Sequence, residues 1–102
     1  GKGYGVWRVG EEVPETFGLS SVYPNPFNGE LVVEYGVRRG ERYRVGVYDV
    51  GGREVGRIGE GLGVGVRERR VWRASETLAS GVYFVRLHTS SQTSIAKIAL
   101  LR

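Results

Sequence analysis

The sequence contains no cysteine and no methionine, and it has only one histidine and one aspartate among its 102 residues. The absence of cysteine excludes disulfides, thiolate zinc sites and cysteine nucleophiles. His88 is the only histidine and Asp49 the only aspartate, so the sequence has few residues with which to build a metal site or a Ser-His-Asp triad. We therefore expect no catalytic residue, no metal site and no cofactor. A chain without methionine cannot begin at its own translation start, so we expect a processed piece of a longer protein.

No apolar run approaches the roughly 18 residues that a membrane-spanning helix needs, so no transmembrane segment is expected. The formal charge is +4 at pH 7, and most of the basic residues are arginines. Arginine binds phosphate well and could indicate a nucleic-acid partner. Because the arginines alternate with glutamates instead of forming a basic run, we favour solvated strand faces and expect no nucleic acid.

The length is that of one small domain, and its pattern is that of strands and turns. Residues 1–18 mix glycine, proline and glutamate, and we interpret them as a linker or the end of an upstream region, with a possible short strand at 6–9. Residues 19–102 form the domain. Short apolar–polar alternations predict strands at 19–23, 31–37, 43–47, 53–58, 66–72, 82–89 and 94–101.

No segment has a helix-length apolar stripe, and turns recur every 8 to 12 residues. The sequence therefore predicts an all-β fold, an antiparallel immunoglobulin-like β-sandwich of about seven strands. Tyr83, Val85 and Leu87 are expected to face the core. The glycine-rich segment 59–65 is expected to be a flexible connection between strands.

An unusual segment follows the first expected strand: Tyr23, Pro24, Asn25, Pro26, Phe27 and Asn28. Its two prolines fix the backbone and exclude a helix, which leaves a stiff arch. Asn25 and Asn28 have carboxamides that can bond to nearby backbone, and we expect Tyr23 and Phe27 to plug one end of the sandwich. A recognition loop is the alternative to this lid, and we favour the lid.

A tight turn is expected after the strand at 43–47. Asp49 is followed by Gly51 and Gly52, and Gly52 is expected to adopt the left-handed conformation. A lone carboxylate beside such a turn could bind a metal. More often it accepts hydrogen bonds from backbone N–H groups, and this is the role we expect for Asp49.

The final segment is apolar on both faces. Ile98 and Leu100 share one face, while Ile95, Ala99 and Leu101 share the other with Lys97. A strand buried on both sides fits this pattern, and so does a strand that docks a partner by strand addition. The residues alone leave the two interpretations open.

Taken together, segments 23–28, 47–55, 78–87 and 97–102 resemble the type A C-terminal sorting domain of the type IX secretion system of Bacteroidota. More distantly, they are similar to the immunoglobulin-like domain of flagellar hook-capping proteins. The family pattern is Y-P-N-P-F-N, V-Y-D-x-x-G-R-x-V, a Trp-bearing strand, L-A-S-G-V-Y-x-x-R-L and a terminal K-x-x-L-L-K/R. All five pieces occur here in that order.

The resemblance implies a non-catalytic domain that directs a larger exported protein through the periplasm and the outer membrane to secretion or the cell surface. The implied partners are the upstream cargo domain, the outer-membrane type IX translocon and a sortase that cleaves around residues 10–19. The implied recognition tail is Lys97, Leu100, Leu101 and Arg102. The implied fold-holding residues are those of segment 23–28 together with Asp49, Gly52, Arg53 and Gly81.

One alternative function remains at this stage. An immunoglobulin-like accessory or carbohydrate-binding module of a secreted hydrolase would have the same fold. Trp7, Trp72 and Tyr48 are the aromatic residues that could stack on sugar rings in such a module.

Overall fold

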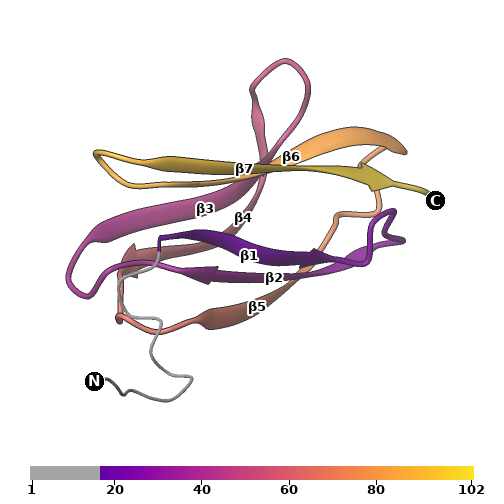
Figure 1. The fold of residues 1–102 in the computed structure, drawn as a ribbon. Helices are drawn as coiled ribbons and strands as arrows, with labels where there is room; N and C mark the ends of the chain where they lie inside the picture. The colour runs from indigo at the N-terminus through magenta and orange to yellow at the C-terminus, as the bar shows by residue number, and fades with distance from the viewer. Residues whose placement is uncertain (1–16) are drawn as a thin grey trace.

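The computed structural model describes residues 17–102, which form two stacked antiparallel sheets (Figure 1). One sheet has the order β1-β2-β5 and the other the order β4-β3-β6-β7. The all-β, seven-stranded sandwich predicted from the sequence is confirmed. The strands are β1 (Gly18–Tyr23), β2 (Glu30–Gly36), β3 (Arg42–Tyr48), β4 (Glu54–Leu62), β5 (Glu68–Arg73), β6 (Gly81–His88) and β7 (Thr93–Leu100).

The core lies between the two sheets and consists of every second residue of their central strands, as the alternation predicts. Tyr83, Val85 and Leu87 are buried, so their predicted orientation is confirmed. The side chains that are almost completely excluded from solvent are Phe27, Leu31, Val33, Tyr35, Val37, Val45, Val47, Val85, Leu87, Ile98 and Leu100.

A polar contact joins the two sheets inside this core. The hydroxyls of Tyr35 on β2 and Tyr43 on β3 lie 3.0 Å apart, and Arg70 of β5 donates to the Tyr35 hydroxyl at 3.2 Å. Burial, followed by the bond with Tyr43, raises the pKa of Tyr35 well above its ordinary value of 10.0. A buried hydroxyl without a partner is costly, so this contact also fixes the two sheets relative to each other.

The prediction of a flexible connection at 59–65 is wrong for its first half. Gly59 and Gly61 lie within β4, where they pair with Val45 and Tyr43 of β3. The sequence pattern is misleading because glycine weakens a strand when it is considered alone, whereas here a complete neighbouring strand supplies the hydrogen bonds. The possible strand at 6–9 lies outside the described residues.

Candidate functional site at the C-terminal strand

The C-terminal strand β7 is an edge strand with one buried and one open face. It pairs on one side with β6. Ile98 and Leu100 are buried in the core, whereas Ile95 is 59% exposed and Leu101, just beyond the strand, is 57% exposed. Of the two interpretations left open by the sequence, burial on both faces is therefore excluded. One apolar face of β7 completes the core, and the other is presented outward.

The arch formed by residues 23–28 lies along the free edge of β7. The Asn25 side chain donates from Nδ2 to the carbonyl of Lys97 at 3.1 Å, and its Oδ1 accepts the N–H of Ala99 at 3.1 Å. A primary amide presents a donor and an acceptor side by side, much as a peptide unit does. Asn25 therefore takes the place of a neighbouring strand and covers an edge that would otherwise be unpaired.

Phe27 continues this pairing with its backbone. Its N–H donates to the Ala99 carbonyl at 2.8 Å, and its carbonyl accepts the Leu101 N–H at 2.9 Å. The Phe27 ring is 1% exposed, and its centroid lies 6.1 Å from that of Trp72. The expected lid over the core is therefore confirmed for Phe27, which also fixes the end of β7.

Tyr23 does not plug the core, so that part of the prediction is wrong. It pairs with Val32 on the outer face of the three-stranded sheet, is 41% exposed, and donates from its hydroxyl to Glu34 at 3.1 Å. Pro24 and Pro26 follow cis peptide bonds and are exposed. Asn28 is exposed, and its carboxamide makes no hydrogen bond to residues 17–102, so the predicted amide bonding is confirmed for Asn25 alone.

The last residue of the chain is bound by the loop that precedes β6. The Arg102 N–H donates to Ser80 Oγ at 2.9 Å, and its guanidinium donates to the carbonyls of Leu78, at 3.1 Å, and Ser75. Gly81, the first residue of β6, pairs with Leu100. Segments 23–28, 78–81 and 97–102, far apart in the sequence, therefore meet at one end of the sandwich, close to the C-terminus in Figure 1.

The four residues of the implied tail occupy different environments. Lys97 is exposed, and its ammonium makes no ion pair with residues 17–102. Leu101 is exposed, and Arg102 is also exposed although hydrogen-bonded. Leu100 is fully buried, so in the folded domain it anchors β7 and is not presented at the surface.

The turn between β3 and β4 has the predicted structure. Asp49 Oδ1 accepts the N–H groups of Gly51 and Arg53, both at 2.9 Å, and Gly52 has a φ of 89°. The bond from the Arg53 backbone is the main cause that lowers the pKa of Asp49 from its ordinary value of 3.8. Among residues 17–102, no group of three or more potential metal ligands occurs. Asp49 therefore stabilises the turn.

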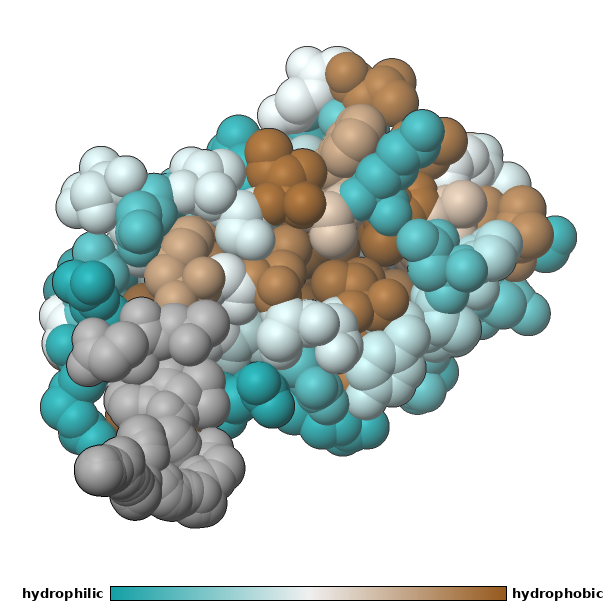
Figure 2. Space-filling model, viewed as in Figure 1, coloured by the Kyte–Doolittle hydropathy of each residue, from teal (hydrophilic) through white to brown (hydrophobic). Residues whose placement is uncertain are grey.

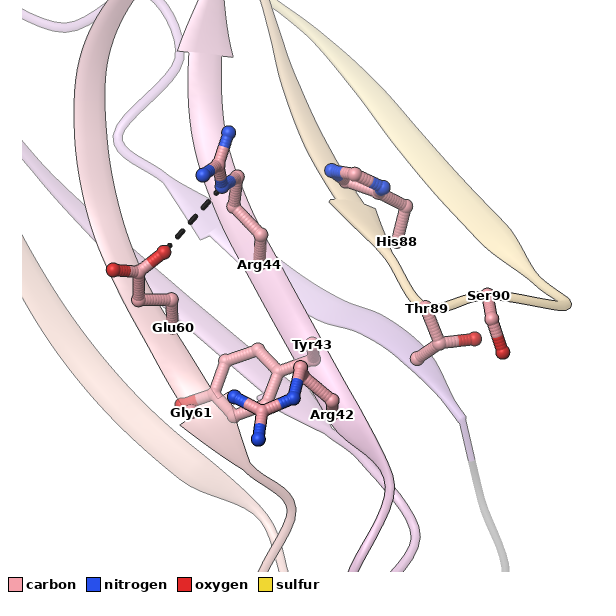
Figure 3. Close-up of a pocket in the computed structure, with 8 residues that line it drawn as sticks. All are labelled: Arg42, Tyr43, Arg44, Glu60, Gly61, His88, Thr89 and Ser90. Carbon is pink, nitrogen blue, oxygen red and sulfur yellow. Dashed lines mark ion pairs between the residues drawn. The ribbon is translucent and has the colours of Figure 1, made fainter.

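A surface hollow of about 670 Å³, which the sequence did not predict, lies on the outer face of the four-stranded sheet (Figure 3). Arg44 within it forms an ion pair with Glu60 at 3.4 Å. Burial, then the neighbouring Arg86 and Arg44, lower the pKa of His88 from its ordinary value of 6.5, which favours the neutral imidazole. Because its lining residues come from separate strands, no local sequence signal could have identified it. Glu60 compensates the charge of Arg44, and Arg42 is the other cation that lines the hollow.

The aromatic residues considered for sugar stacking are not free platforms. Arg86 lies over the Tyr48 ring, 4.1 Å from its centroid, and Tyr48 is only 8% exposed. Trp72 is half-buried beside Phe27, and its ring packs against Gly56. Trp7 lies outside the described residues. Within residues 17–102, nothing favours the carbohydrate-binding alternative.

Comparison with known proteins gives one match. The family model described as the secretion system C-terminal sorting domain matches residues 21–100. The match extends from within β1 to the end of β7, and therefore includes both the arch and the strand that the arch covers. No curated protein and no solved structure matches the chain. Among residues 17–102, no helix is long and apolar enough to cross a membrane.

Proposed function

This chain belongs to the secretion system C-terminal sorting domain family, and from that premise we propose that the folded sandwich presents its C-terminal end to the outer-membrane type IX machinery. The family is a sorting signal for type IX secretion, so the chain is an address for export to the cell surface or the medium. Sorting requires recognition and no bond-making, and the proposal therefore assigns no catalytic residue. The arch, Asp49, Gly52, Arg53 and Gly81 maintain the fold.

The observation that carries this proposal is the pairing of the arch with β7. Asn25 and Phe27 bind the backbone of Lys97, Ala99 and Leu101, so the end of the chain has a defined position. Lys97 and Leu101 then project into solvent from an ordered backbone. A preorganised surface loses little conformational entropy on binding, which favours recognition. Lys97, Leu101 and Arg102 are the proposed contacts, and Leu100 is their anchor.

A fusion of the full chain to a periplasmic reporter, in a host that has the type IX system, tests this function. We expect export of the reporter, and we expect removal of Leu101 and Arg102 to reduce export about tenfold or more, as loss of a contact near 1.4 kcal/mol would. Leu101 and Arg102 lie beyond β7 and are exposed, so their removal leaves no cavity in the core and takes away only their hydrogen bonds to Phe27 and to the loop before β6. Export of the shortened fusion at the full rate would contradict the proposed contacts, and failure of the full fusion would contradict the function.

We also propose that a cell-surface sortase removes the domain by cutting within the expected window of 10–19, no later than the first two residues of β1. Leu19 already donates its N–H to Ser94 Oγ on β7 at 3.1 Å, so a cut beyond it would remove part of an edge strand from the sandwich. In the same export experiment, the mass of the released reporter locates the cut. A cut after Leu19 would contradict this assignment.

A further inference from the structure

One face of the sandwich combines exposed apolar side chains with uncompensated positive charge. On β6 and β7, the residues between the core positions point outward. Val82 is 38% exposed and Ile95 is 59% exposed. Lys97 lies directly opposite Phe84, and Ile95 lies opposite Arg86. We call this surface the β6–β7 strip, and it consists of Val82, Phe84, Arg86, Ile95, Lys97 and Leu101.

The space-filling view shows apolar residues along the β7 edge of the sandwich. In Figure 2, which has the orientation of Figure 1, brown apolar residues gather over β7 in the upper part of the molecule, and hydrophilic side chains interrupt them. Soluble domains rarely leave large contiguous apolar surface exposed unless it meets a partner.

Ion pairing differs sharply between the two halves of the same sheet. On the β3–β4 half, Arg57 pairs with both Glu54 and Glu60, at 3.2 and 3.3 Å, and Arg44 also pairs with Glu60. On the β6–β7 half, the sequence from Gly81 to Arg102 has no aspartate or glutamate at all. Ion pairs therefore hold Arg44 and Arg57 on the β3–β4 half, whereas β6 and β7 supply no carboxylate of their own.

No ion pair holds the cations of the strip among residues 17–102, although the pKa of Glu54 on β4 is lowered first by its hydrogen bond from Arg57 and then, among other charges, by that of Arg86. Lys97 makes no ion pair within residues 17–102, and the buried Nε of Arg86 has no hydrogen-bond partner there. The outer face of the other sheet is different: Arg73 pairs with Glu30 at 2.8 Å and Arg69 with Glu34 at 3.8 Å. Ion pairs thus hold cations on the outer face of the other sheet and on the β3–β4 half, whereas none holds a cation of the β6–β7 strip among residues 17–102.

We infer that the β6–β7 strip docks on a protein surface that combines apolar side chains with carboxylates. The apolar residues supply area to bury, and the ammonium of Lys97 then requires an opposite charge, because burying an unpaired ammonium is costly. A second copy related by a two-fold axis would place cations against cations and is disfavoured. This inference rests on the proposed function, in which the partner is a component of the secretion machinery.

The test uses two matched pairs of substitutions in the full-chain reporter fusion. Lys97→Glu reverses the charge but keeps a charged residue on the edge strand, so its protection against edge pairing remains. We expect it to reduce export tenfold or more, as loss of a charged contact would, while Lys97→Arg exports normally. Arg67→Glu is the matched control, because Arg67 is exposed, lies before β5 and makes the same charge change outside the strip.

A second pair of substitutions tests the apolar residues of the strip. Ile95→Ser is expected to reduce export, whereas Val71→Ser, which changes a residue that is 52% exposed on the other sheet, is not. Thermal unfolding of each purified chain checks that folding is retained. Equal export by the wild type, Lys97→Glu and Ile95→Ser would overturn the strip and remove Lys97 from the proposed contacts, while the sorting function itself would stand. Failure of the wild-type fusion would instead overturn the proposed function.

A lipid surface is distinguished by a separate measurement. The purified full chain is floated with phosphatidylcholine vesicles, with and without phosphatidylglycerol. We expect no binding to either. Binding to the anionic vesicles that Lys97→Glu abolishes would identify a membrane partner and overturn the protein partner inferred here.

Discussion

Replacing Phe27 by alanine is expected to lower the free energy of unfolding by about 3–5 kcal/mol, the range found for buried aromatic side chains. Phe27 is 1% exposed and fills the end of the core beside Trp72. Its backbone also holds Ala99 and Leu101, so the cavity is created where the C-terminal strand is attached. Urea unfolding of the two chains measures the difference.

Tyr23→Ala is the matched control in the same arch. Its ring is 41% exposed and makes one surface hydrogen bond, to Glu34, so we expect a loss of about 1 kcal/mol or less. A similar loss for the two substitutions would contradict the division of roles in which Phe27 closes the core and Tyr23 does not.

Leu100→Ala is expected to cost about 2–5 kcal/mol, while Leu101→Ala changes the stability by no more than about 0.5 kcal/mol. The two leucines are neighbours, but Leu100 is fully buried and Leu101 is 57% exposed. Removing the first leaves a cavity between the sheets, whereas removing the second leaves the core unchanged. Chemical unfolding of both variants gives the comparison.

The same pair separates stability from recognition. Leu101→Ala in the reporter fusion should weaken export with unchanged folding, because Leu101 is a proposed contact. Leu100→Ala should weaken export only to the extent that the domain unfolds. Normal export by Leu101→Ala would remove Leu101 from the recognition surface, and full stability of Leu100→Ala would contradict its place in the core.

The features that the sequence predicted correctly are local ones. The alternation of Tyr83, Val85 and Leu87 identifies a core face because strand side chains alternate with a period of two. The Asp49 turn is likewise predictable, since its acceptor and its donors lie within four residues of each other. Phe27 was expected to close the core because an aromatic residue in a proline-stiffened arch has few other places to bury its ring.

The features that escaped prediction depend on topology. Asn25 binds Lys97 across 72 positions in the sequence, and only the placement of β7 at the sheet edge brings them together. The carboxamide of Asn25 was expected to find backbone, but nothing local could say which strand would supply it. Tyr23 was misplaced for a similar reason, since its orientation follows from its register with Val32 on β2.

Two of the segments that carry the family resemblance, 23–28 and 97–102, thus form one structural unit. The arch covers the outer edge of β7 near the C-terminus, while Leu19 of β1 binds Ser94 near the start of β7. An uncovered edge strand is a template for unwanted pairing, so this cover also protects the domain from aggregation. It leaves the outward side chains of β7 accessible on a fixed backbone.

Amide hydrogen exchange, followed by NMR on the full chain, tests this unit most directly. The Ala99 and Leu101 amides are expected to be protected in the wild type, since they donate to Asn25 and Phe27. In Asn25→Ala, the Ala99 amide should lose protection while that of Val85, in the central strand β6, keeps it. Free exchange of Ala99 and Leu101 in the wild type, or unchanged protection of Ala99 in Asn25→Ala, would contradict the account.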